Sequence, residues 1–287
     1  TAQPDMWAQT AEWWRSLVAV GAFVGLAHGV NYQLFRRVAG YDPPTAYYCA
    51  NPGGLIESLQ LGEEAGGNVA LLAVQHFSRI ALTVTIVPLV YWAMRGEVVG
   101  SAAGVTLGDT TAPVGVLDLA LLAACAILGG WGGRRIGLPA AIITGPVILS
   151  TLVHALGWTE AVPPAWLISV AQLVIGVGLA LRFGGMTRRL LTQGIGFGAL
   201  SVALMLSIGA GMAWVLSLTG EHPFQILLMC YAPGGVVEMG LIALSLNASP
   251  VMVTLHHIVR IGFTVIAVPL IGRHLVLPTP GERERVE

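Results

Sequence analysis

Two stretches of the chain are near copies of one another, and they decide the fold. Residues 50–80 read ANPGGLIESLQLGEEAGGNVALLAVQHFSRI, and residues 231–261 read YAPGGVVEMGLIALSLNASPVMVTLHHIVRI. Aligned without gaps at an offset of 181 residues, positions 52–89 and 233–270 are identical at 12 of 38 places. Apolar matches are common by chance in a hydrophobic chain, but a repeated Pro-Gly-Gly with Glu, His and Arg in one register is not. The chain therefore contains an internal duplication.

The composition is typical of a membrane protein. Of the 287 residues, 55% are hydrophobic and 10% are charged, and the mean hydropathy is +0.76. Globular domains carry roughly 25% charged residues, and about 20 apolar residues in a helix span the hydrocarbon layer. We therefore expect an all-α polytopic membrane protein. The expected crossings are residues 13–35, 68–93, 116–133, 139–157, 165–182, 194–218 and 249–274.

The repeated Pro-Gly-Gly elements interrupt two apolar segments. Proline removes a helical donor and glycine frees the backbone, so segments 44–65 and 224–246 are each expected to form two half-helices. If each segment is a re-entrant hairpin, eight arginines near segment ends fall on one face and two on the other, whereas spanning segments split them six to four. The positive-inside rule favours the hairpins. Each full repeat then has an odd number of crossings, which predicts two inverted repeats with broken helices, a transporter architecture.

The duplication also divides the chain into domains. We expect residues 1–95 to be the first repeat, 96–115 a linker, 116–276 the second repeat and 277–287 a polar C-terminal tail. At the offset of 181 residues, the counterpart of the opening of the second repeat would lie before residue 1. We therefore expect the first repeat to lack its opening helices, either because the sequence is a processed or partial form of a longer protein, which we favour, or because the first copy is naturally short.

Charge, cysteine and glycine patterns narrow the partners. All 14 basic residues are arginines and they form no basic run, so nucleic acid is not an expected partner, while membrane lipids are. Cys49, Cys125 and Cys230 show no zinc or redox spacing and are expected to be reduced packing residues. Glycines recur at four-residue spacing over residues 21–29, which predicts close helix packing and is compatible with a homodimer.

The two repeated arginines carry the functional argument. Arg79 and Arg260 each lie about 16 Å along an apolar helix, at 1.5 Å per residue, and hence near the bilayer midplane. A guanidinium there costs several kcal/mol unless it meets a carboxylate, water or a ligand. Contact with an anionic substrate is one interpretation. Structural pairing with Glu57 and Glu238, which follow the two breaks, is the alternative.

The other repeated residues are candidates for the same site. A half-helix after a break begins with unpaired amides and a positive dipole end, which favour an anion. Thr83 and Thr264 lie one turn beyond the arginines and could bind a ligand or the preceding turn of their own helices. The expected substrate-binding residues are Arg79, Arg260, Pro52, Gly53, Gly54, Pro233, Gly234, Gly235, Thr83 and Thr264. The expected ion-coupling residues are Glu57, Glu238, His76 and His257, with H⁺ or Na⁺ as the coupling ion; no cofactor, catalytic residue or metal site is assigned.

The two stretches quoted above, together with RRIGLPAAIITGP at residues 134–146, resemble the bacterial membrane AbrB family. The resemblance covers both copies and is most specific at the Pro-Gly-Gly-x-x-Glu elements and the His-x-x-Arg helices. It implies a duplicated membrane module in the bacterial cytoplasmic (inner) membrane, unrelated to the soluble DNA-binding regulator of the same name. Members carry two kinds of label, a regulator of aidB expression and an ammonia monooxygenase.

Together these residues predict a secondary transporter of a small anionic metabolite, with a carboxylate as the expected class, held between the repeats near the bilayer midplane. The chain is not expected to be an enzyme. Two alternatives remain open. An intramembrane metal-dependent enzyme, monooxygenase-like, would have to use the repeated His and Glu residues, which lack metal-ligand spacing within one helix. A membrane sensor or regulatory subunit would instead affect gene expression.

Overall fold

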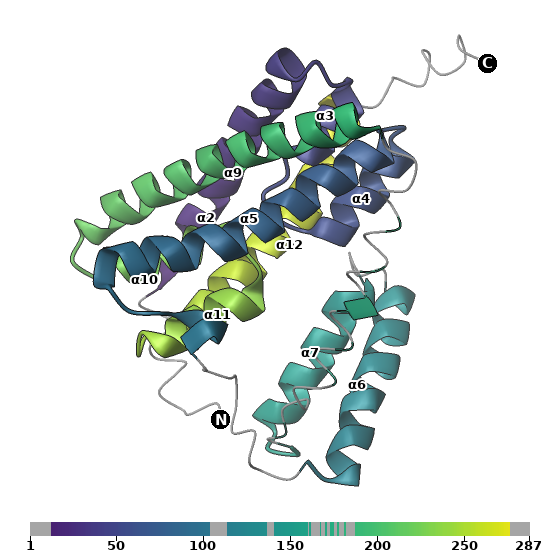
Figure 1. Cartoon of the computed structure of the whole chain (residues 1–287). Coiled ribbons are helices and arrows are strands. Elements are labelled where there is room, and N and C mark those ends of the chain that lie inside the picture. The colour runs from purple at the N-terminus through teal and green to yellow at the C-terminus, as the bar shows by residue number, and fades with distance from the viewer. Residues whose placement is uncertain are drawn as a thin grey trace. The chain divides into compact units, whose positions relative to one another are not determined.

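The computed structural model describes most of the chain as helices. Its described residues contain no strand, which confirms the all-α class for this part of the chain. They fall into two compact units: a small unit within residues 1–14 and 106–178, and a large unit within residues 15–105 and 179–287 (Figure 1). Each unit is described by itself. The described residues are 13–103, 114–136, 141–159, 161, 167, 170, 173, 174, 177, 181 and 187–275.

Five described helical segments are long and apolar enough to cross a membrane. They are α2 (Trp14–Gln33) with its π-helical extension η1 (Leu34–Val38), α5 (Val69–Arg95), α6 (Val116–Arg135), α9 (Arg188–Ser217) and the Pro250–Gly272 part of α12 (Pro250–Leu275). Each coincides with a crossing expected from the sequence, so the chain is a multi-pass helical membrane protein. The expected crossing at 139–157 contains the 15-residue helix α7 (Ala141–Ala155). The expected crossing at 165–182 lies largely outside the described residues, as does the expected tail at 277–287.

Two pairs of short helices lie beside the long ones, and each pair is separated by Pro-Gly-Gly. The first pair is α3 (Pro43–Cys49) and α4 (Leu55–Glu64), and the second is α10 (Phe224–Tyr231) and α11 (Val236–Ser245). The longest have 10 residues, or about 15 Å, which is half the hydrocarbon thickness. At the offset of 181 residues, α3, α4 and α5 begin at positions equivalent to the starts of α10, α11 and α12. The starts of these helices therefore follow the same offset as the repeated sequence.

The first short pair is a hairpin that returns to the end at which it starts. The amide of Asn68, just before α5, donates to Thr45 Oγ1 in α3 at 2.7 Å. A Cβ placed on Gly67 would lie 2.9 Å from the carbonyl oxygen of Gly62 in α4 and 3.3 Å from Thr45 N. The start of α3, the end of α4 and the start of α5 therefore lie together.

The second short pair has its base at the opposite end of α5. Tyr91 Oη, in the last part of α5, donates to the carbonyl of Gln225 at the start of α10. The amide of Gly100, which begins the short 3₁₀-helix η2 (Gly100–Ala103), donates to Ser245 Oγ at the end of α11 at 3.0 Å. Both ends of this pair thus lie near the C-terminal end of α5.

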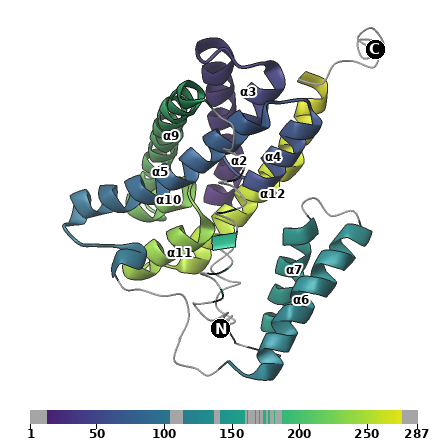
Figure 2. The same cartoon turned by 45° about the vertical axis from the view of Figure 1, so that its right-hand side comes forward.

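The two long helices of the repeats run in opposite directions. Tyr47 Oη, in the first hairpin, donates to the carbonyl of Val268 near the end of α12 at 2.8 Å. A Cβ on Gly272, also in α12, would lie 2.8 Å from Tyr47 Cε1. The end of α12 therefore lies at the base of the first hairpin, where α5 begins, and both views show this antiparallel course (Figures 1 and 2).

The helix that precedes each hairpin packs against the long helix of the other copy. Gln75 Nε2 in α5 donates to the carbonyl of Gly194 in α9 at 2.9 Å. At the equivalent position of α12, His256 Nε2 forms a hydrogen bond with Ser16 Oγ in α2 at 2.9 Å. Within the large unit, α9 of the second copy therefore packs against α5 of the first, and α2 of the first packs against α12 of the second.

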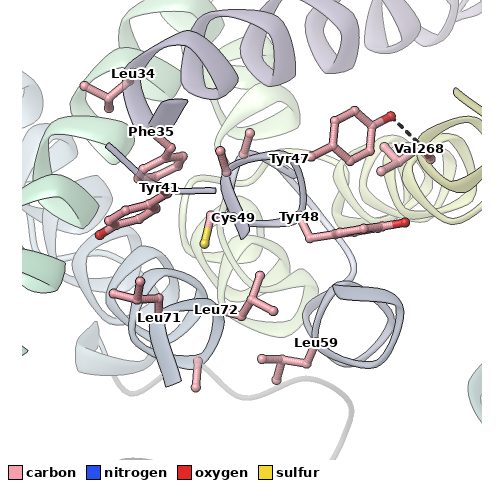
Figure 3. Close-up of a cluster of buried hydrophobic side chains, with 13 residues drawn as sticks. Leu34, Phe35, Tyr41, Tyr47, Tyr48, Cys49, Leu59, Leu71, Leu72 and Val268 are labelled. Atoms are coloured by element: carbon pink, nitrogen blue, oxygen red, sulfur yellow. Dashed lines mark hydrogen bonds between the residues drawn. The ribbon is translucent and has the colours of Figure 1, made fainter. Parts of the chain in front are cut away.

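A cluster of buried apolar side chains surrounds the first hairpin (Figure 3). Its members come from η1, the turn before α3, both hairpin helices, α5 and α12, and Cys49 within it is a free thiol, as expected. The cluster consists of Leu34, Phe35, Tyr41, Ala46, Tyr47, Tyr48, Cys49, Ala50, Leu59, Leu71, Leu72, Ala73 and Val268. Because Val268 belongs to the second copy, this core joins the two copies.

In the small unit, the described helices α6 and α7 are in close contact. A Cβ on Gly129 would lie 2.6 Å from Pro146 Cα, and a Cβ on Gly145 would lie 1.9 Å from the carbonyl oxygen of Gly129. Only glycine permits such an approach between backbones, as in other tightly packed membrane helices. Thr159 Oγ1 also donates to Asp118 Oδ1 at 2.6 Å.

Replacing Gly198 by Ala tests the contact between α9 and α5. A Cβ at this position would lie 2.9 Å from Ser78 Cβ, which cannot rotate away, so we expect a lower melting temperature, corresponding to about 1–3 kcal/mol of overpacking. Gly196→Ala, two residues along the same helix, is the control because no atom lies within 4 Å of its added Cβ. Equal melting temperatures for the two variants would show that the helices do not approach this closely.

Candidate functional site

Each Pro-Gly-Gly tip packs against the long helix of the other copy. A Cβ on Gly53 would lie 3.1 Å from Thr264 Oγ1 in α12, and a Cβ on Gly234 would lie 3.2 Å from Thr83 Cγ2 in α5. These contacts are equivalent at the offset of 181 residues, so both tips depend on glycine for close approach. Burial also matches between the copies: Pro52, Gly53, Pro233 and Gly234 are buried, while Gly54 and Gly235 are half-buried.

Each repeated arginine binds the carbonyl end of the short helix that precedes the tip of its own copy. Arg79 Nη1 donates to the carbonyl of Asn51, and Arg260 Nη1 donates to the equivalent carbonyl of Ala232. Arg260 Nη2 also donates to the carbonyl of Gly234 at 3.0 Å. A cation at the C-terminal end of a helix meets unpaired carbonyls and the negative end of the helix dipole. The arginines thereby hold the two tips in place.

Both guanidinium groups are deeply buried near the first tip. Arg79 is 6% exposed and Arg260 is 3% exposed. Arg260 Nε lies 3.7 Å from the Cβ position of Gly53, two residues beyond the residue whose carbonyl Arg79 binds. Neither arginine forms an ion pair with any residue that the structure describes. In the described part of the chain, Glu57 in particular forms no ion pair with either arginine.

Several polar atoms of the repeated residues and of Asn51 are buried but have no hydrogen-bond partner among the described residues. They are the Nε atoms of Arg79 and Arg260, Thr83 Oγ1, Asn51 Oδ1, His76 Nδ1 and His257 Nε2. Buried donors and acceptors in native proteins are nearly always paired with protein, water or a ligand. The unpaired donors on both arginines are therefore the strongest geometric indication of a binding site.

The two threonines differ in their hydroxyl contacts. Thr264 Oγ1 donates to the carbonyl of Ile261 at 2.8 Å, in the preceding turn of its own helix. Thr83 Oγ1 is fully buried and has no partner in the described part of the chain. Of the two, Thr83 has the hydroxyl that can contact a ligand.

The repeated glutamates lie in the first turns of α4 and α11. Glu57 and Glu238 are each three residues after their N-cap glycines, Gly54 and Gly235, and are half-buried. Glu57 Oε2 lies 3.1 Å from the Cβ position of Gly54, whose backbone is left-handed with φ of 59°. A carboxylate here is stabilised by the positive end of the helix dipole. The amide end assigned to a substrate anion thus already lies close to Glu57.

The repeated histidines are fully buried one turn before the arginines. His76 Nε2 lies 2.9 Å from the carbonyl of Tyr48, and His257 Nδ1 lies 2.9 Å from the carbonyl of Val253. Among the described residues, no group of three or more His, Cys, Asp and Glu side chains is placed to hold a metal ion.

Asn51 and Ser58 in the first hairpin were not singled out from the sequence. Asn51 Nδ2 donates to Ser58 Oγ at 2.6 Å, and both side chains are buried. The equivalent residues in the second copy are Ala232 and Met239. Positions at which the copies differ within an otherwise matching block would have indicated this polar pair.

Comparisons with known proteins identify the family. The family model described as "Transition state regulatory protein AbrB" matches residues 1–276. The chain is 22% identical over 267 residues to an Escherichia coli (strain K12) protein named as a proposed regulator, AbrB; the match covers 93% of this chain and 76% of that protein. It is 26% identical over 258 residues to YhjN of Bacillus subtilis (strain 168), a protein described as uncharacterized, across 83% of this chain and 65% of that one. No solved structure matches the chain. Because the family model covers nearly the whole sequence, the chain belongs to the AbrB family.

Proposed function

We propose that the chain is a secondary transporter of a small carboxylate, bound between the two hairpin tips. The observation that carries the proposal is the pair of buried arginines, Arg79 and Arg260. Among the described residues, they form no ion pair and their Nε donors have no hydrogen-bond partner. A guanidinium inside an apolar bundle requires compensation. A carboxylate can accept charge-assisted hydrogen bonds from both arginines.

The arrangement of the hairpins supports alternating access. The first hairpin has its base where α5 begins, and the second has its base near the end of α5. We infer that the copies are inverted repeats and that the short helices reach the middle of the bacterial cytoplasmic membrane from opposite faces. A site between their tips would then open to one face or to the other, according to which hairpin moves.

We assign ion coupling to Glu57 and Glu238, and we include His76 and His257 in the same role. The Glu57 carboxylate lies beside the tip that Arg260 approaches, so it repels an incoming anion while it is charged. A proton or Na⁺ at this carboxylate would remove that repulsion. Uptake of the cation and of the anion would thereby be linked.

A regulatory role is the second candidate, because the Escherichia coli relative is named as a proposed regulator. Transport of a metabolite would affect gene expression indirectly, so the two roles are compatible. Binding of a carboxylate by the purified chain distinguishes the transporter from a regulator that binds only a partner protein.

Replacing Arg79 or Arg260 by Gln is expected to abolish carboxylate binding. In wild-type protein in detergent, a small carboxylate should raise the melting temperature, because a ligand at 100 times its Kd stabilises the folded state by about 2.7 kcal/mol. Each Gln variant should show no such rise above its own ligand-free melting temperature. This comparison separates binding from the loss of the bond that each arginine makes to its tip.

Arg95→Gln is the matched control, because Arg95 is an exposed arginine at the end of the same helix as Arg79. It should keep the full carboxylate-induced rise. Phosphate and sulfate serve as comparison anions. A rise that persists in both folded Arg79→Gln and Arg260→Gln would show that the arginines do not hold the anion.

Replacing Glu57 by Gln is expected to uncouple transport from the cation gradient. When the variant is reconstituted into lipid vesicles, an imposed H⁺ or Na⁺ gradient should no longer accelerate carboxylate uptake. Carboxylate binding in detergent should persist. Glu64→Gln, at the exposed far end of the same helix, should behave as wild type. Unchanged gradient dependence in Glu57→Gln and also in Glu238→Gln would rule out these carboxylates as the coupling groups.

A further inference from the structure

The first hairpin tip contains a buried acceptor that has no partner. Ser58 Oγ donates its hydrogen to the carbonyl of Gly53 at 3.4 Å. It must therefore accept from Asn51, whose Nδ2 lies 2.6 Å away. This assignment leaves Asn51 Oδ1 as a hydrogen-bond acceptor that is buried and unpaired among the described residues. Such an atom is costly unless a donor from water or a ligand reaches it.

The unpaired acceptor belongs to Asn51, which also contacts the candidate site through its backbone. The carbonyl of Asn51 is the one that binds Arg79, and Gly53, two residues on, lies against Arg260 and Thr264. Asn51 is itself only 2% exposed. The same tip therefore combines two buried cationic donors with a neutral amide acceptor.

The second tip is apolar where the first is polar. Ala232 and Met239 replace Asn51 and Ser58, and Met239 is fully buried. The Met239 methyl carbon lies 2.9 Å from the Cβ position of Gly234. A ligand between the tips would meet polar groups on the first hairpin and a thioether on the second.

We propose that the ligand is a small hydroxycarboxylate. The proposal rests on the transporter function above. The carboxylate accepts from the unpaired Nε donors of the arginines, the hydroxyl donates to Asn51 Oδ1, and the hydrocarbon part lies against Met239.

Charge excludes the nearest competitors. An amino acid would offer a donor to Asn51 Oδ1, but its ammonium group would lie beside two guanidinium groups and be repelled. A dicarboxylate would place a second acceptor against the amide oxygen, where no hydrogen bond can form. A hydroxyl is the neutral donor that satisfies both conditions.

The test compares ligands that differ by one hydroxyl. Dissociation constants of purified full-length protein are measured by calorimetry for lactate and propanoate, and for glycolate and acetate, with alanine and malonate as charged competitors. We expect each hydroxyacid to bind about tenfold more tightly than its deoxy partner, which is the typical size of one net hydrogen bond. Alanine and malonate should bind more weakly than lactate.

Asn51→Ala introduces the residue that the second copy has at this position. The variant should bind lactate only as tightly as propanoate, and its affinity for propanoate should equal that of the wild-type protein. The control is Asn31→Ala, because Asn31 in α2 is also a buried asparagine with an unpaired Oδ1; it should keep the tenfold preference. If Asn51→Ala does not fold, the double variant Asn51→Ala, Ser58→Met reproduces the whole pair found in the second hairpin.

The outcomes separate this inference from the proposed function. If no carboxylate binds the wild-type protein, the transporter proposal fails, and this inference fails with it. If the hydroxyacids and their deoxy partners bind equally, the hydroxycarboxylate is wrong while the carboxylate site stands. A preference that persists in folded Asn51→Ala also overturns the inference.

Discussion

The bond from a buried guanidinium to the carbonyl end of a short helix is the interaction on which the large unit depends. A helix that ends inside an apolar bundle leaves carbonyls without partners, and each costs several kcal/mol in hydrocarbon. Arg79 and Arg260 meet this requirement at equivalent carbonyls, those of Asn51 and Ala232. The same bond compensates part of the cost of each buried charge. This mutual dependence explains why the arginine and the Pro-Gly-Gly break recur in one register.

Each tip is also held by the other copy, so neither copy forms the site alone. Gly53 lies against Thr264, and Gly234 lies against Thr83, so closely that the side chain of a larger residue would clash with the threonine. The helix that precedes each hairpin likewise packs against the long helix of the other copy, as the hydrogen bond from Gln75 in α5 to α9 shows. On the proposed mechanism, a hairpin that moves would slide along a helix of the opposite copy, and movement on one side would change the contacts available on the other.

The sequence predicts the helices and their breaks well, because proline and glycine act locally and an apolar run of about 20 residues has few alternatives in a membrane. It predicts side-chain partners poorly. Charge offers Glu57 as one possible partner for Arg79, but it does not give the position of either group: the glutamate lies at the amide end of its own helix, and the arginine reaches a carbonyl end. The packing of α9 against α5 and of α2 against α12 depends on tertiary contacts, which no local sequence pattern encodes. Asn51 was missed because it lies outside the identical positions.

Duplication with divergence at the tips has a consequence for direction. Two copies with the same arginines would hold a carboxylate equally from both sides, and opening either hairpin would cost the same. Asn51 and Ser58 on one tip, against Ala232 and Met239 on the other, remove that equivalence. On the proposed mechanism, opening the first hairpin breaks a hydrogen bond to the ligand, whereas opening the second breaks an apolar contact. The ligand-bound protein would therefore open more readily at the second hairpin, so the two faces would release the ligand at different rates although the scaffold is repeated.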